Sequence, residues 1–145
     1  LYLIVNAVDG IASGAYCYWP EAHGLEQLQA GDFRGQAGYL CLDQALGSDA
    51  SAVIFFLADL GPILERFGNR GYRLANLEAG ITGGKCYLGA YGQGFGASGL
   101  TFYDGDVVRF FSPHARGKDA LFVTVLGRSV SGVPGTEVPL QLAKK

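Results

Sequence analysis

Three runs of apolar residues divide the chain and predict the strands of a sheet. Residues 1–8, 51–58 and 120–127 are almost continuously hydrophobic and rich in β-branched and aromatic side chains. A strand that is covered on both faces has this pattern, whereas a half-exposed strand alternates apolar and polar residues. We therefore expect three buried strands, with residues 1–8 in the middle of the sheet.

The stretch between the first two runs predicts a hairpin and then a short helix. Tyr16 and Tyr18 lie at alternating positions before a turn at residues 20–24, and a further apolar alternation follows the turn. Asp32 can then cap a helix whose inward positions, from Phe33 to Cys41, recur at helical spacing.

Two more helices are expected after the second run. Asp59 with Pro62 can start a brief helix that Gly68 ends, and residues 70–91 form the longest helical candidate. The long helix contains several glycines, each of which costs about 1 kcal/mol in a helix interior. Close contact must offset that cost, either tight packing inside one core or contact with a second subunit or a cofactor.

The segment after the long helix predicts a glycine turn, a short extended piece and a small helix capped by Asp104 over residues 106–111. The residues after 128 are expected to be irregular because they contain Pro134 and Pro139. The element order predicts an α+β fold with helices on a mixed central sheet.

Length and charge narrow the classes of function. A chain of 145 residues has the size of one domain, and 11 Lys and Arg against 13 Asp and Glu give a net charge of −2. No basic field exists to attract nucleic acid or an anionic membrane, and no apolar run approaches the roughly 20 residues that span a bilayer. Three widely spaced cysteines argue against a disulfide framework or a zinc site. We expect a cytoplasmic protein with reduced thiols.

The beginning of the sequence bears on domain organisation. The chain lacks Met even at position 1 and opens directly on an interior strand. We expect residues 1–145 to form a single domain that is incomplete.

Several short motifs match the residue pattern of known sites but not the secondary structure or full spacing that those sites require. Gly94-x-Gly96-x-x-Gly99 matches the dinucleotide fingerprint, which requires a strand before it and a helix after it, and here the order is reversed. Residues 80–86 resemble a phosphate loop but lie inside the long helix. Residues 96–100 lack the last glycine of a nucleophile elbow.

Titratable residues also form no self-sufficient catalytic set. The histidines are His23, in the expected hairpin turn, and His114, which lies with Arg109, Arg116 and Lys118 in a polar stretch. That cationic cluster could hold an anion or be a solvated loop. Because no acid/base pair is evident, we expect any chemistry to come from a bound cofactor, and no catalytic residue is named.

Two segments carry a resemblance to a known family. The sequences GYRLANLEAG and GFGASGLTFYDGDVVRFFSPHARGKDALFVTVLG, with the opening LYLIVNAVDGIASGAYCYWPEAHGLEQL, resemble the nitroreductase superfamily and, within it, the SagB-type dehydrogenases. Members of that superfamily are flavoenzymes with an α+β fold, usually homodimers that hold FMN at the subunit interface.

The resemblance implies a cofactor site and an interface. The backbone N–H groups of the segment Ser98, Gly99, Leu100, Thr101 and Phe102 would face the N5 and O4 edge of the flavin, and Gly96 and Gly99 would permit the close approach. Arg128 is a candidate contact to the phosphate or the flavin edge, or else an ordinary surface arginine, and Lys118 is a further candidate cation. The glycine-rich helix would be the interface helix of a homodimer.

The sequence departs from the family pattern in three places. The arginine-rich stretch and the Pro-Ser-Ala-Gly-type segment that hold the FMN phosphate would lie upstream of residue 1. Gly83, Gly84 and Lys85 replace polar family positions. Azoline-oxidising members are associated with a Lys-Tyr pair where this chain has Arg66-Phe67, and arginine keeps its proton too firmly to act as a base.

These observations lead to one hypothesis and two alternatives. The chain would belong to an FMN-dependent oxidoreductase that transfers hydride equivalents between NADH or NADPH and an organic acceptor. One alternative, a peptide azoline dehydrogenase, is disfavoured by Arg66-Phe67. The other is a non-catalytic module that has lost FMN and acts as a binding or scaffold subunit.

Overall fold

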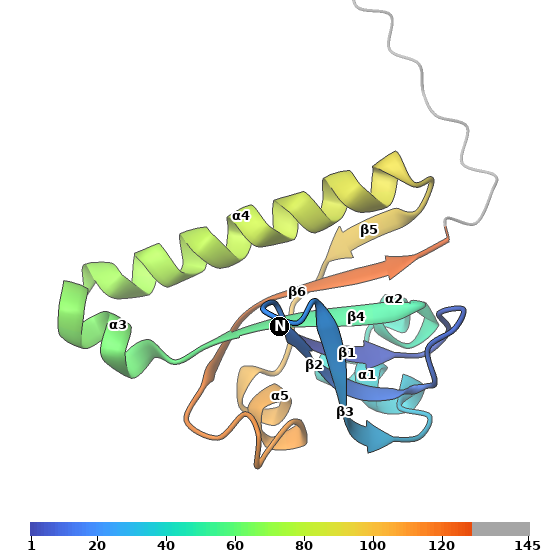
Figure 1. Ribbon diagram of the computed structural model, residues 1–145, viewed down its shortest axis with the longest axis horizontal. Helices are drawn as coiled ribbons and strands as arrows, with labels where there is room; N and C mark the ends of the chain where they lie inside the picture. The colour runs from blue at the N-terminus through green and yellow to red at the C-terminus, as the bar shows by residue number, and fades with distance from the viewer. Residues whose placement is uncertain (129–145) are drawn as a thin grey trace, which may run out of the picture.

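The computed structural model describes residues 1–128, which form a six-stranded sheet with helices on both faces (Figure 1). The irregular segment expected after residue 128 lies outside the described residues. In chain order the elements are β1 (Tyr2–Val5), β2 (Gly14–Trp19), β3 (Gly24–Ala30), α1 (Arg34–Leu40), α2 (Ala45–Asp49), β4 (Ala52–Ala58), α3 (Leu60–Phe67), α4 (Arg70–Gly92), β5 (Gly96–Gly99), α5 (Asp104–Phe110) and β6 (Asp119–Gly127).

The strand order across the sheet is β3-β2-β1-β4-β6-β5, so the three apolar runs occupy its centre as predicted. The expectation of a mixed sheet is wrong for the described residues, since all five strand pairs within them are antiparallel. The reason lies in how the chain returns after α2. Val5, at the end of β1, pairs with Ala52, at the start of β4, so the two central strands run in opposite directions.

The main core lies between the sheet and the layer formed by α1, α2 and α5 (Figure 1). Phe55 on β4 and Phe111 after α5 are its largest buried side chains, with ring centroids 5.8 Å apart. Ala37, Leu40 and Cys41 face this core, which confirms the helical spacing read from the sequence.

Local side-chain chemistry sets the helix ends. Asp59 caps α3 as expected by accepting from the Gly61 N–H at 3.2 Å. Asp32 accepts from the Arg34 N–H at 3.0 Å from one position before the expected cap, since the cap residue of α1 is Phe33, which makes no side-chain capping bond. The expectation for Asp104 is wrong, because α5 begins at that residue and its cap is Tyr103, which makes no side-chain capping bond. An acidic residue in the first turn still favours the helix through its dipole.

The long helix α4 covers the opposite face of the sheet, above β5 and β6 (Figure 1). A Cβ atom at Gly83 would lie 2.5 Å from Cε1 of Phe122 on β6, so this glycine permits the helix to approach the sheet. Gly80, Gly84 and Gly89 have no atom within 4 Å of such a Cβ and face open space. A Cβ atom at Gly71 would likewise lie 2.7 Å from the carbonyl oxygen of Ile63 on α3. Packing within the protomer therefore explains Gly71 and Gly83 but not the other three.

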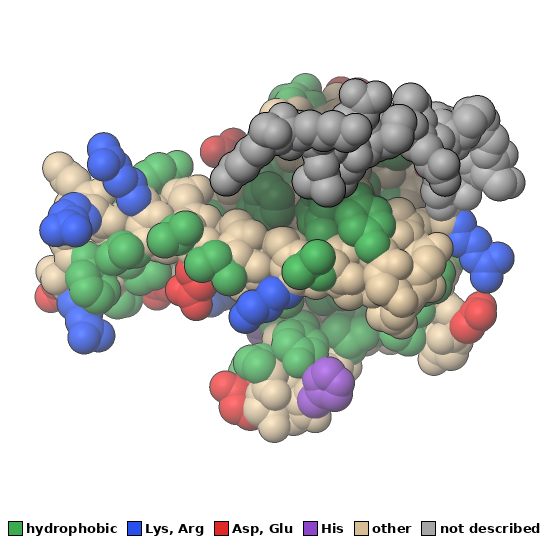
Figure 2. All heavy atoms as spheres, turned by 90° about the horizontal axis from the view of Figure 1, so that it is seen from above, with side chains coloured by type: hydrophobic (Ala, Val, Ile, Leu, Met, Phe, Trp, Pro, Cys, Tyr) green, Lys and Arg blue, Asp and Glu red, His purple; other side chains and the backbone are tan. Residues whose placement is uncertain are grey.

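Apolar side chains recur along the outward side of α4, among polar and charged ones (Figure 2). Leu77 and Leu88 are 60% and 75% exposed, although leucine side chains on a helix normally turn toward a core. We call the exposed apolar side chains of this helix the α4 ridge; they are Tyr72, Leu74, Leu77, Ile81, Leu88 and Tyr91. Within residues 1–128, none of the helices has the length and hydrophobicity needed to cross a bilayer.

Candidate functional site

The segment that follows α4 lies at one edge of the sheet. β5 pairs only with β6 among residues 1–128, with Ser98 opposite Val125 and Gly99 opposite Thr124. The outer edge of β5 has no strand beside it in this part of the chain. The hydroxyl of Tyr91 on α4 donates to the carbonyl of Ala97 at 3.1 Å and holds the strand under the helix end.

The chain then runs from β5 to α5 across the corner between α1 and α2. Leu100 and Phe102 pack against the main core, whereas Thr101 between them is exposed. The Tyr103 N–H donates to the Leu40 carbonyl at 2.9 Å, and Nε2 of Gln44 lies 3.3 Å from both the carbonyl and Oγ1 of Thr101. The segment is thus fixed at its middle and at its end.

The backbone donors of this segment are available to a ligand. The N–H groups of Leu100, Thr101 and Phe102 find no hydrogen-bond acceptor in the portion of the chain that the structure describes. Backbone N–H groups are strong donors that are normally paired in a folded protein. Three successive unpaired donors beside a free sheet edge can receive the oxygen and nitrogen acceptors of a bound group.

Gly99 is needed for a reason other than the one expected from the sequence. A Cβ atom at this position would lie 3.0 Å from the Tyr87 hydroxyl oxygen and 3.3 Å from Cζ of Phe122. Both side chains belong to the same protomer. The space beside the α-carbon is therefore taken by α4 and β6, and any close approach of a ligand must use the other side of the backbone.

Arg128 follows β6 and is exposed beside a cleft of about 780 Å³. This volume lies in the range of roughly 300–1,000 Å³ that is usual for small-molecule sites. The walls come from the loop after β1, the start of β4, the C-terminal half of α4 and the end of β6. The polar side chains among its lining residues are Asp9, Ser51, Cys86, Gln93 and Arg128.

The structure separates the two parts of the predicted site. Gly127 pairs with Gly96, so Arg128 lies about three strand residues, or roughly 10 Å, from the register position of Ser98. Thr101 and Phe102 lie farther along in the same direction. Only an elongated ligand can reach both Arg128 and this segment. Lys118 precedes the nine-residue strand β6, roughly 30 Å from Arg128, so the two cations cannot contact the same phosphate.

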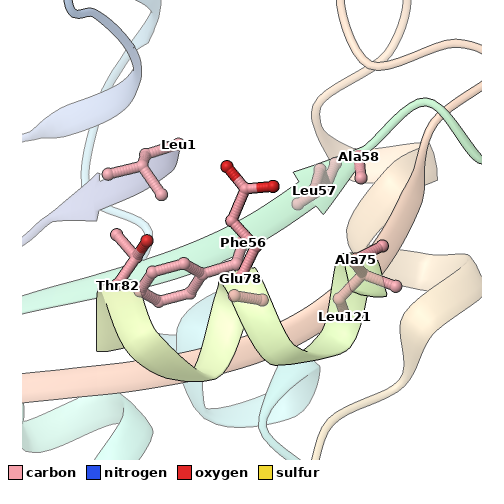
Figure 3. Close-up of a pocket in the computed structure, with 9 residues that line it drawn as sticks. Leu1, Phe56, Leu57, Ala58, Ala75, Glu78, Thr82 and Leu121 are labelled. Atoms are coloured by element: carbon pink, nitrogen blue, oxygen red, sulfur yellow. The ribbon is translucent and has the colours of Figure 1, made fainter. Parts of the chain in front are cut away.

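A second, smaller pocket of about 190 Å³ lies between α4 and the sheet (Figure 3). Phe56 on β4, Leu121 on β6 and Glu78 and Thr82 on α4 line it, together with Leu1. It is smaller than ordinary ligand sites. None of the residues predicted to bind the cofactor lines this pocket, so it is not part of the candidate site.

The cationic cluster expected around His114 does not form a site for an anion. Arg109 pairs with Asp106 at 2.6 Å, within the turn of α5. His114 turns to the sheet, where Nδ1 lies 2.8 Å from the hydroxyl oxygen of Tyr2. His23 lies in the hairpin turn as expected and pairs with Tyr18 at 2.9 Å.

The context of the rejected motifs is as predicted. Helix α4 ends just before Gly94, and Gly96 to Gly99 themselves form strand β5, so no strand precedes the motif and no helix begins at it. Residues 80–86 lie within α4. At the end of α3 the guanidinium of Arg66 lies 5.0 Å from the centre of the Phe67 ring, a cation–π contact with no acid/base function.

The cysteines are free thiols with little reactivity. Burial raises the pKa of Cys41 to about 11, and burial is also the main cause of the raised pKa values of Cys17 and Cys86. A thiol with a raised pKa is a poor nucleophile at neutral pH. In the part of the chain described here, no group of three or more His, Cys, Asp or Glu side chains could hold a metal ion.

Sequence reasoning missed Gln44 and Tyr87, which contact the predicted segment from outside it. Gln44 lies 57 residues before Thr101 in the chain. Its only local signal is the turn that presents it, in which Leu42 and Asp43 both have positive φ, at 58° and 55°. Nothing in the sequence links either residue to the segment.

Comparison with known proteins gives the fold a family context. No family model matches the chain. A protein of Methanocaldococcus jannaschii that is provisionally named a nitroreductase is 27% identical over 108 residues, which are 74% of this chain and 54% of that protein. The chain therefore spans about half the length of the curated relative that it matches.

Solved structures agree with this similarity. A crystal structure from Anabaena variabilis, provisionally named a nitroreductase, superposes with a TM-score of 0.82 at 36% identity over 88% of this chain and 26% of that chain. Another from Ralstonia eutropha with the same provisional name has a TM-score of 0.71 at 23% identity, over 90% of this chain and 58% of that chain.

A third similar structure is the E. coli microcin synthetase McbBCD complex with truncated pro-MccB17 bound. It has a TM-score of 0.75 at 19% identity, over 89% of this chain and 51% of that chain. At this identity the likeness concerns the fold alone. The chain therefore has the nitroreductase-like α+β fold, and the similarities to the M. jannaschii and A. variabilis proteins support the nitroreductase superfamily.

Proposed function

We propose that this chain is part of an FMN-dependent oxidoreductase of nitroreductase type. The observation that carries the proposal is the row of N–H groups at Leu100, Thr101 and Phe102, which have no acceptor among residues 1–128 and lie beside the edge of β5 that no strand of these residues covers. A flavin ring presents acceptor atoms along one edge, and a fixed row of backbone donors is complementary to it. The similarity to provisionally named nitroreductases supports the general oxidoreductase class.

The residues of the chain fit such a cofactor in two places. Ser98, Gly99, Leu100, Thr101 and Phe102 would present their backbone to the ring edge, on the side of Gly99 that Tyr87 and Phe122 leave open. Arg128, exposed beside the large cleft, would contact the phosphate end through a charge-assisted hydrogen bond. When bound, FMN would accept and return a hydride, which none of the described side chains can do alone.

The contribution of the chain is then binding and charge stabilisation. The donor row is held against the main core by Leu100 and Phe102, so its N–H groups do not have to reorganise when negative charge develops on a bound ring. NADH or NADPH would supply the hydride, and a small organic or peptide substrate would receive it.

The α4 ridge supports a homodimer as the working form. Its exposed leucines and open glycines give a smooth apolar surface on which a second copy of the helix could pack closely. The similar structure that contains several kinds of subunit also leaves assembly with other partners open. The three free thiols are consistent with a reducing, cytoplasmic location.

Two alternatives predict different behaviour in a binding experiment. A non-catalytic module would keep the fold and the α4 ridge but would not bind FMN. A peptide azoline dehydrogenase would bind FMN, and the fold likeness to a complex that holds a pro-peptide is the observation in its favour. Arg66 and Phe67 form a surface cation–π pair and provide no base for that chemistry.

The experiment is FMN binding to the whole protein that carries this sequence. We expect a yellow protein with about one FMN per protomer and quenching of flavin fluorescence on binding. Thr101→Pro removes one N–H of the donor row and should weaken binding, whereas Thr101→Ser keeps both that N–H and the hydroxyl that Gln44 contacts and should not. A colourless protein that does not bind added FMN would favour the non-catalytic module.

A comparison of FMN with riboflavin tests the assignment of Arg128. Arg128→Gln should weaken the binding of FMN at least several-fold but leave the binding of riboflavin, which lacks the phosphate, nearly unchanged. Equal losses for both ligands would place Arg128 away from the phosphate.

A further inference from the structure

The Gln44 side chain lies at the centre of the contact between the α1–α2 corner and the donor row. Its Nε2 atom is 2.7 Å from the Cys41 carbonyl oxygen and 3.3 Å from both the carbonyl oxygen and Oγ1 of Thr101. Since carbonyl oxygens only accept, the amide nitrogen must face them. The orientation of the amide is therefore determined by its surroundings.

The backbone around Gln44 holds the side chain in that place. Leu42 and Asp43 adopt left-handed conformations, with φ of 58° and 55°, which bring the chain sharply from α1 into α2. The Gln44 N–H donates to the Cys41 carbonyl at 3.3 Å, and the Gln44 carbonyl accepts from the Gly47 N–H at 2.9 Å. A long side chain with its backbone fixed at both ends loses less freedom when it binds a neighbour.

The bond to Thr101 acts on the peptide unit that the proposed function uses. The carbonyl of Thr101 and the N–H of Phe102 belong to the same peptide group, so a donor at that oxygen polarises the N–H and strengthens it as a donor. The Phe102 N–H has no acceptor among residues 1–128. Gln44 therefore contacts the carbonyl oxygen of a peptide group whose N–H has no acceptor among residues 1–128.

We propose that Gln44 is a positioning residue for the cofactor site, which orients the Thr101–Phe102 peptide and strengthens its N–H toward the acceptor edge of a flavin. This inference rests on the proposed function. Gln44 need not touch the cofactor itself. Because Gln44 would act through this peptide group, substitutions at Gln44 should change both the affinity for flavin and the rate of backbone hydrogen exchange at residues 100–103.

The test uses the whole protein with Gln44→Leu, which removes the donor, and Gln44→Glu, which replaces the donor by an acceptor of similar shape. Gln29→Glu is the matched control, because Nε2 of Gln29 also donates to a backbone carbonyl, that of Phe110 at 3.3 Å, while its strand β3 is the opposite edge of the sheet. Flavin fluorescence gives the dissociation constant of FMN for each protein, and hydrogen exchange of the FMN-free proteins reports the order of residues 100–103.

We expect both Gln44 variants to weaken FMN binding by about tenfold, the effect of one hydrogen bond, and to speed exchange at residues 100–103. The control should change neither quantity. Lowering the pH from 7 toward 4 should partly restore the Gln44→Glu variant relative to Gln44→Leu, because a protonated carboxyl can donate to the Thr101 carbonyl. A role confined to the bond with the Cys41 carbonyl would change hydrogen exchange in the α1–α2 corner but not at residues 100–103.

The other outcomes contradict either the role of Gln44 or the proposed function. If the unaltered protein binds FMN and both Gln44 variants bind it equally well, the role of Gln44 is wrong and the proposed function stands. If the variants lose affinity but the pH change restores neither, the Gln44 side chain supports the fold and not the donor. If the unaltered protein does not bind FMN, the proposed function fails and the role of Gln44 fails with it.

Discussion

The hydroxyl of Tyr2 lies 2.8 Å from Nδ1 of His114, although 112 residues separate the two in the chain. Burial raises the pKa of Tyr2 to about 12, with smaller contributions from Cys17 and Glu26, so the phenol keeps its proton. The other ring nitrogen of His114, Nε2, lies 4.0 Å from the Glu26 carboxylate. This contact fastens the loop after α5 to the first strand.

Removing the imidazole should cost stability. His114→Ala leaves the buried phenol of Tyr2 with only the weaker contact to the backbone carbonyl of residue 114, at 3.2 Å. We expect the free energy of unfolding to fall by about 1–2 kcal/mol in urea titrations. His23→Ala, which removes the exposed partner of Tyr18, is the control and should cost less. Equal losses for the two variants would contradict a specific role for the Tyr2–His114 contact.

The raised pKa of Tyr2 predicts a loss of stability in alkali. The unfolded phenol ionises near pH 10, while the folded phenol keeps its proton until about pH 12. Because deprotonation then favours the unfolded state, the contribution of Tyr2 is complete below pH 10 and is lost as the pH rises from 10 to 12.

The Tyr2→Phe variant should therefore lose stability less steeply between pH 10 and 12, as measured by thermal unfolding at a series of pH values. Tyr72→Phe alters a tyrosine that is 54% exposed and should follow the unaltered protein. A phenolate absorbance titration in which every tyrosine ionises near pH 10 would rule out this explanation.

Two adjacent glycines of α4 should respond in opposite directions to alanine. Gly83→Ala places a Cβ 2.5 Å from the Phe122 ring and should lower the free energy of unfolding by about 1–3 kcal/mol. Gly84→Ala meets no atom within 4 Å and should raise it by about 0.5–1 kcal/mol, since alanine favours the helix. Chemical denaturation measures both, and a Gly83→Ala protein as stable as the original would mean that α4 does not lie this close to β6.

Substitutions of Gly99 should lower the stability of the protein because its neighbours belong to the same protomer. The family resemblance gave Gly99 a role in the close approach of a cofactor. The contact with Tyr87 predicts instead that even Gly99→Ala lowers the melting temperature, and that adding Tyr87→Phe, which removes the hydroxyl oxygen 3.0 Å away, recovers part of the loss. Additive effects of the two substitutions would show that they do not share this contact.

The α4 ridge should determine the association of the protein. Leu77→Glu places a charge on the ridge and should convert a dimer into monomers in analytical ultracentrifugation, with an unchanged circular dichroism spectrum. Leu46→Glu is the matched control, because Leu46 on α2 is 56% exposed on the other side of the sheet, similar to the 60% of Leu77. A Leu77→Glu protein that still dimerises would exclude the ridge as the interface.

The sequence by itself determined all but one of the elements of this fold and most of their ends; the short helix α2 was not predicted. Strands and helices follow from periodicity over a few residues, and caps such as Asp59 and Gly68 act on neighbours within one turn, so no distant residue is needed to predict them. The resemblance in residues 71–127 also supplied the superfamily, which the fold and the similar proteins support.

Only the tertiary structure decided how those elements meet. Strand direction in the central pair depends on where the chain returns after α2, and no local pattern encodes it. Gly83 and Gly84 are equivalent in sequence, yet Phe122 fills the space beside one and leaves the other open. The contacts of Gln44 with Thr101 and of Tyr2 with His114 join distant parts of the chain, because packing, not spacing along the chain, brings such side chains together.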